Sequence, residues 1–99
     1  MIKGFRTYDL ALELYANCEP IKAKPHLKDQ LARASLSIVL NIAEGSAKPT
    51  KADKRRFYAI ALGSVRETQT LLQITNQEQK IIDIADKLGG HLYGLVHSK

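Results

Sequence analysis

QLARASLSIVLNIAEG, residues 30–45, is the stretch that decides the fold of this chain. At about 100° per residue, its apolar side chains cover most of a helix and leave a polar arc of roughly 80–100°. That arc is formed by Arg33, Ser37, Asn41 and Glu44. A surface helix has one apolar stripe, whereas a helix that is apolar nearly all round is buried on several sides. The stretch therefore predicts the central helix of a bundle, with part of its apolar arc covered by another subunit.

The composition indicates one globular domain spanning residues 1–99. Hydrophobic residues make up 44% and charged residues 25% of the chain, which is ordinary for a folded protein. No apolar run reaches the roughly 18 residues of a transmembrane helix, and Asp9 and Glu13 interrupt the N-terminal apolar segment, unlike a secretory signal. The single cysteine, Cys18, excludes an internal disulfide and is typical of a small buried hydrophobic side chain. We therefore expect a cytoplasmic protein with no membrane partner.

The charged residues are biased toward the basic types. Fifteen Lys and Arg residues against ten Asp and Glu residues give a net charge of +5 at pH 7. Such a bias favours a polyanionic partner such as RNA or DNA, or an acidic protein surface. The simpler alternative is that the charge only keeps the protein in solution.

Four helical segments separated by short breaks account for nearly the whole chain. They are expected from Phe5 to Glu19, from Pro25 or His26 to Glu44, from Thr50 or Lys51 to Asn76, and from Glu78 to Val96. No stretch alternates in the manner of a strand, so we expect no sheet. Short connections make consecutive helices antiparallel, which predicts an all-α, up-down-up-down four-helix bundle.

The apolar spacing assigns a core face to each helix. In the first helix this face is Phe5, Tyr8, Leu12, Tyr15 and Cys18. In the third it is Phe57, Ile60, Ala61, Ser64, Thr68, Leu71 and Leu72, with Tyr58 and Val65 at its edge. In the fourth it is Ile81, Ile84, Ala85, Leu88, Leu92, Leu95 and Val96.

Several glycines also carry expectations. Gly45 suits the left-handed position that ends a helix. Gly63 and Ser64 weaken the third helix, which suggests a close approach of the second helix there. Three glycines in the fourth helix, at 89, 90 and 94, predict a bend or fraying.

A basic cluster between the second and third helices is the first candidate site. It comprises Lys48, Lys51, Lys54, Arg55 and Arg56, offset only by Asp53. These residues surround a helix N-terminus, where free N–H groups already favour anions. Tyr58 could stack on a base, and Arg66 lies on the same side of the helix as Arg55. The alternative is an ordinary solvated helix start.

Lys22, Lys24 and Lys28 form a second basic patch. In an up-down bundle, the first and third connections share one end and the second lies at the other. The two patches are therefore expected at opposite ends of the molecule.

The remaining polar residues favour a structural role. The arc from Arg33 to Glu44 has no histidine near Ser37 in sequence, so a polar network that reaches Glu67 or another subunit is favoured over catalysis. His26, His91 and His97 are too scattered for a metal site. No glycine-rich phosphate loop is present, and we expect no metal, no cofactor and no enzymatic activity.

Three motifs together resemble a known family. They are QLARASLSIVLNIAEG, FYAIALGSVRET at residues 57–68, and the Y-x-x-A-x-x-L-Y pattern of Tyr8, Ala11, Leu14 and Tyr15. This combination is similar to the four-helix bundle proteins encoded in 23S rRNA intervening sequences, and it matches least in the fourth helix. The resemblance implies a cyclic homopentamer without enzymatic activity. It also implies similarity to the accessory variability determinant proteins of diversity-generating retroelements, which are basic pentameric barrels that bind nucleic acid and partner with a reverse transcriptase.

Two functional hypotheses follow. The first is a non-enzymatic oligomeric bundle that binds RNA or DNA backbones through its basic patches. The second is a protein-interaction scaffold, or an accessory subunit of a nucleic-acid enzyme such as a reverse transcriptase.

Overall fold

The computed structural model describes residues 5–98 and contains four helices, with no strand in that range. They are α1 (Arg6–Cys18), α2 (Pro25–Ser46), α3 (Lys51–Ile74) and α4 (Gln79–Val96). This confirms the all-α prediction, and each helix end lies within two residues of its expected position. None of the described helices is both long and apolar enough to cross a membrane.

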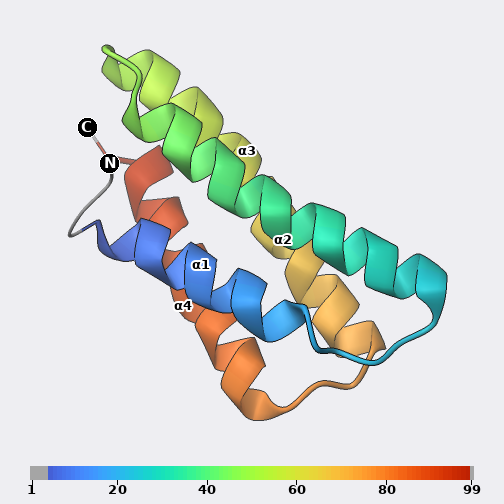
Figure 1. Ribbon diagram of the computed structural model, residues 1–99. Coiled ribbons are helices and arrows are strands. Elements are labelled where there is room, and N and C mark those ends of the chain that lie inside the picture. The colour runs from blue at the N-terminus through green and yellow to red at the C-terminus, as the bar shows by residue number, and fades with distance from the viewer. Residues whose placement is uncertain (1–4, 99) are drawn as a thin grey trace.

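The helices pack as a ring in chain order. Each consecutive pair is in contact, and α1 also packs on α4, which closes the ring (Figure 1). Consecutive helices run in opposite directions, so the α2–α3 turn lies at one end of the molecule and the other two connections lie at the opposite end (Figure 1). The resulting body measures 40 × 22 × 21 Å.

Local sequence signals explain where the helices begin and end. Pro25 occupies the start of α2, and the Thr50 hydroxyl accepts a hydrogen bond of 3.1 Å from the Asp53 amide at the start of α3. Asn76 takes the left-handed conformation, with φ of 54°, just beyond α3. The Gln77 amide then donates to the Leu72 carbonyl at 3.1 Å, which closes the end of α3.

The core is built from aliphatic side chains of all four helices. Its largest fully buried members are Leu10, Leu14, Leu31, Ile38, Ile42, Val65, Leu72, Leu88 and Leu92. Cys18 is buried beside them, as expected. Burial raises the pKa of its thiol to about 11, although a hydrogen bond from Ser35 acts in the opposite direction. The side chain therefore remains a neutral thiol at neutral pH.

The predicted core face of α1 is correct for Cys18 and wrong for Leu12. The buried residues are Thr7, Leu10, Ala11, Leu14 and Cys18, whereas Leu12 is 42% exposed. Tyr8 and Tyr15 are half-buried at the edge of this stripe. Because α1 lies between α2 and α4, its aliphatic stripe fills the centre and the tyrosines stay where their hydroxyls meet water.

The core face of α3 is rotated relative to the prediction. Tyr58 and Val65 are buried, whereas Phe57 is half-buried and Ile60 is 46% exposed. The reason is that α3 packs on both α2 and α4, so its buried centre lies between the two contacts. Since Tyr58 is only 7% exposed, it is not available to stack on a base, and that expectation is also wrong.

The glycines behave differently from expectation. Gly45 lies inside α2, not in a left-handed position beyond it, and a Cβ there would be 2.9 Å from Tyr58 Cε1 and 3.0 Å from Phe57 Cβ. The close approach of α2 and α3 is therefore at Gly45. Apart from its own stretch of helix, no described part of the chain lies within 4 Å of a Cβ at Gly63, although Ser64 does contact Ser37 of α2. The helix α4 continues past its glycines to Val96, so the expected fraying is not observed.

Replacing Gly45 with alanine should test this close approach. Alanine favours a helix by about 1 kcal/mol over glycine, but here its methyl group would displace the buried ring of Tyr58. We expect Gly45→Ala to lower the free energy of unfolding by about 1–3 kcal/mol, measured by urea denaturation followed by circular dichroism.

The matched control is Gly90→Ala in α4, where an added Cβ meets no described atom. This variant should be more stable than the wild type by about 0.5–1 kcal/mol. A Gly45→Ala protein as stable as Gly90→Ala would contradict the packing.

Candidate nucleic-acid interface

The basic cluster lies at the end of the molecule formed by the α2–α3 turn (Figure 1). We call residues 48–56 the basic hairpin. Of its five cationic residues, Lys48 lies in the α2–α3 turn and the other four lie in the first two turns of α3, with Asp53 among them. The free amides at the start of α3 add to the positive potential.

Two cations of the basic hairpin lie over one aromatic ring. The Lys48 Nζ is 5.0 Å and the Arg56 Cζ is 4.7 Å from the centroid of the Phe57 ring. Such cation–π contacts orient each cation without neutralising it. Lys48 also forms an ion pair of 3.0 Å with Glu44, which removes part of its charge from the surface potential. Arg56 is exposed and forms no ion pair with the described residues.

Lys54 has a structural role in the basic hairpin. Its Nζ donates a hydrogen bond of 2.9 Å to the carbonyl of Ser46, the last residue of α2. The ammonium thus satisfies one of the orphan carbonyls at the negative end of that helix. Lys54 therefore helps to hold the turn, and its charge is already engaged within the chain.

Arg55 and Arg66 share one side of α3, as predicted. Eleven residues separate them, which corresponds to about 16 Å along the helix. Arg55 is exposed and forms no hydrogen bond or ion pair with the described residues. Arg66 instead lies over α4, where its Nη1 is 3.0 Å from the Cβ position of Gly89 and donates to Gln69 Oε1 at 3.0 Å.

The second basic patch is at the opposite end of the bundle, as predicted. Lys22 and Lys24 are exposed and line a hollow of about 480 Å³ together with Ile74 of α3. Lys28 is engaged in the fold, because its Nζ donates 2.9 Å hydrogen bonds to the carbonyls of Glu19 and Ile21 beyond α1. The structure therefore separates the predicted site residues into two distant groups.

The polar arc of α2 forms the predicted network. Arg33 forms an ion pair of 2.6 Å with Glu67, and the Ser37 and Ser64 hydroxyls are 2.8 Å apart. Asn41 donates to the Ser37 carbonyl at 2.9 Å. The ion pair is too exposed to contribute much stability, but the contacts fix the register of α2 against α3.

The profile of the family described as 23S rRNA-intervening sequence protein matches residues 5–89 of this chain. The chain belongs to that family. The match begins just before α1 and ends within α4, which agrees with the weaker resemblance expected for the last helix. A comparison with curated proteins gave no match.

Two of the polar side chains considered in the sequence analysis form contacts within the bundle. Ser37 bonds Ser64 and Asn41, and His91 lies 3.4 Å from the hydroxyl of Thr7. Within residues 5–98, no three His, Cys, Asp or Glu side chains are grouped as metal ligands would be.

Phe57 is the member of the site that sequence reasoning missed, because its apolar spacing assigned it to the core. The available signal was its position directly after Arg56 and nine residues after Lys48, across a tight turn. The Phe57 ring contacts both Lys48 and Arg56 through its face.

The division of roles within the basic hairpin is testable by stability measurements. Lys54→Met keeps the apolar stem but removes the hydrogen bond to Ser46, and we expect it to lower the free energy of unfolding by about 1 kcal/mol. The control, Arg55→Met, should stay within about 0.5 kcal/mol of the wild type because Arg55 has no partner in the described chain. Equal effects in urea denaturation would refute this assignment.

Proposed function

We propose that this protein is a non-enzymatic bundle that binds the backbone of nucleic acids through the basic hairpin. The observation that carries the proposal is the concentration of five cationic side chains at one end of the molecule, around the N-terminus of α3. Of these, Arg55 and Arg56 are exposed, and neither forms an ion pair with an acidic residue of the described chain. Phosphate oxygens are the ligands that such a surface favours.

The family supports RNA as the first nucleic acid to test, because its description names 23S rRNA intervening sequences. The net charge of +5 provides the long-range attraction that a polyanion requires. Backbone contacts without base contacts predict weak sequence preference. Lys22 and Lys24 form the second contact surface of the proposal, at the far end of the molecule.

The proposal includes assembly of several copies. On α2, Leu36 is 41% and Leu40 is 58% exposed, and Ile60 of the adjacent α3 is 46% exposed. Clustered apolar exposure of this kind is typical of an interface between proteins. The resemblance to pentameric bundles, including the accessory variability determinants, favours a cyclic homopentamer. A ring of five copies would repeat the basic hairpin and multiply its potential.

The same apolar face supports the second candidate function, an accessory subunit that binds another protein such as a reverse transcriptase. The two candidates differ in what covers Leu36 and Leu40. Self-assembly covers them with further copies of the chain, whereas an accessory subunit covers them with one stoichiometric partner and has no need of free RNA.

Nucleic-acid binding can be tested by fluorescence anisotropy with a labelled RNA duplex across a salt series. We expect the logarithm of affinity to fall linearly with the logarithm of salt concentration. Arg55→Ala with Arg56→Ala should weaken binding about tenfold or more and reduce the slope by about 2. Lys87→Ala, which removes an exposed cation from α4, is the control and should have a much smaller effect. Affinity that does not change with salt would disprove the proposal.

Assembly can be tested separately by light scattering coupled to size exclusion. The wild type should exceed the 11.0 kDa of one chain, and Leu36→Glu with Leu40→Glu should lower the mass toward that value. The control is Ile74→Glu, which places one such charge on a 60% exposed side chain at the far end of α3. A stable wild-type monomer at micromolar concentration would exclude self-assembly.

A further inference from the structure

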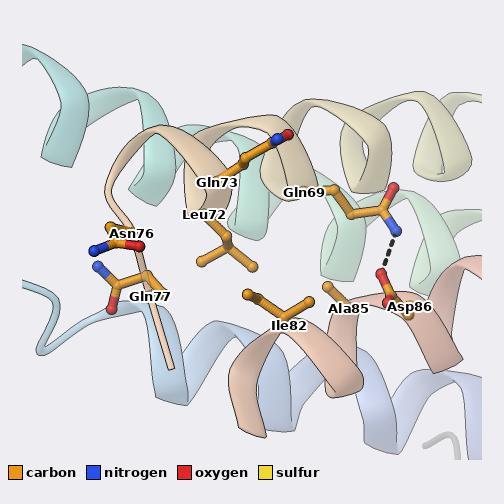
Figure 2. Close-up of a pocket in the computed structure, with 8 residues that line it drawn as sticks. All are labelled: Gln69, Leu72, Gln73, Asn76, Gln77, Ile82, Ala85 and Asp86. Atoms are coloured by element: carbon orange, nitrogen blue, oxygen red, sulfur yellow. Dashed lines mark hydrogen bonds between the residues drawn. The ribbon is translucent and has the colours of Figure 1, made fainter. Parts of the chain in front are cut away.

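A hollow of about 360 Å³ opens between the end of α3, the α3–α4 turn and the start of α4 (Figure 2). We call it the amide wedge. The half-buried side chain of Ile82 provides apolar surface at its floor, with the fully buried Leu72 and Ala85 behind it. Its volume is within the range of small-molecule pockets, toward the lower limit. The wedge is far from the basic hairpin and is not used by the backbone contacts proposed above.

The rim of the wedge is formed mainly by side-chain amides. One end is closed by a bridge in which Gln69 Nε2 donates to Asp86 Oδ1 at 2.9 Å, as the dashed line in Figure 2 shows. Arg66 donates in turn to Gln69 Oε1 at 3.0 Å. These two bonds hold Gln69 and Asp86 in place, so this end of the wedge is organised before any ligand binds.

The other end of the wedge is the α3–α4 turn. Gln77 is held there by its backbone bond to Leu72 and by a side-chain bond of 3.1 Å to the Thr75 carbonyl. Gln73 and Asn76 also line the wedge, and their amides form no side-chain hydrogen bond with residues 5–98. Figure 2 shows the Gln73 amide at the outer edge of the wedge, directed away from Ile82 and Ala85, and Asn76 at the turn. Each of these two amides has two N–H donors and one carbonyl acceptor.

The chemistry of the lining selects a neutral, flat ligand. Among the described residues that line the wedge there is no cation, and the one carboxylate is already bonded to Gln69, so a phosphate group is disfavoured. An apolar floor suits the face of a heterocycle, and a rim of donors and acceptors suits its edge. Nucleobases combine these two properties, and only an unpaired base has its Watson–Crick edge free.

A neighbouring hollow of about 290 Å³ shares Gln77 with the wedge and is lined by Lys22 and Lys80. Glu78 also lines this hollow, so its lining has two ammonium groups and one carboxylate. We propose that the amide wedge binds an unpaired nucleobase of single-stranded RNA, with the adjoining phosphate at Lys22 and Lys80. This inference rests on the proposed function and extends it from backbone contact to base recognition.

The first test is an NMR titration of ¹⁵N-labelled protein with the four ribonucleoside 5′-monophosphates. We expect at least one of the four nucleotides to shift the side-chain amide signals of Gln73 and Asn76. Ribose 5-phosphate, which lacks the base, should not shift them. This experiment reports on the wedge whether or not the basic hairpin binds RNA. The absence of nucleotide-specific shifts would overturn the inference and leave the proposed function standing.

The second test compares single-stranded and duplex RNA of the same sequence by fluorescence anisotropy. The variant combines Gln73→Ala with Asn76→Gly, because glycine tolerates the positive φ at that position. It should bind the single strand about fivefold or more weakly, which corresponds to the loss of one or two hydrogen bonds, and bind the duplex as the wild type does.

The control variant is Gln79→Ala, which removes an amide at the start of α4 that bonds Asp83 and lies outside the wedge. It should bind both RNAs as the wild type does. Equal weakening of both RNAs by the wedge variant would overturn the inference, and melting curves show whether its fold is intact. Nucleotide shifts in a protein that binds no RNA would instead reject the proposed function alone.

Discussion

The close approach of α2 and α3 at Gly45 is the constraint on which the basic hairpin depends. Because glycine has no side chain, the ring of Tyr58 packs directly on α2 at this point. The two helices can then stay together up to their turn, where Lys48 lies over Phe57 and Lys54 bonds the Ser46 carbonyl. The charged end of the molecule is therefore shaped by packing within the hairpin, and the polar contacts from Arg33 to Ser64 continue the same alignment toward the centre.

The helices themselves could be predicted from the sequence, because apolar periodicity, prolines and a Thr50 cap mark their extents. The network from Arg33 to Glu67 was also predictable, since a narrow polar arc on an apolar helix must find partners. The core faces of α1 and α3 could not be predicted fully in this way. In α1, contact with two neighbours placed the aliphatic stripe at the centre and the tyrosine rings at its edges. In α3 the buried ring is Tyr58, which spacing placed at the edge, and Phe57 is half-buried.

The candidate site was predictable only as a cluster of charges. Sequence spacing identified the basic residues and their two opposite locations, but not which lysines the fold already uses. Lys28 and Lys54 donate hydrogen bonds to main-chain carbonyls seven to nine residues away, across turns. Apolar periodicity predicts helices but not the shape of these turns. The amide wedge has no sequence signature either, because it depends on how far α4 departs from α3 beyond the bridge between Gln69 and Asp86.

The elongated shape of the bundle has a consequence for the size of any nucleic acid that it holds. The long dimension is 40 Å, and the two basic regions lie at its opposite ends. In a B-form duplex the rise along the helix axis is about 3.4 Å per base pair, so a duplex lying parallel to the bundle needs roughly a dozen base pairs to span this length. A duplex shorter than this length contacts only one of the two basic regions. Contact of one duplex with both regions therefore requires a minimum length.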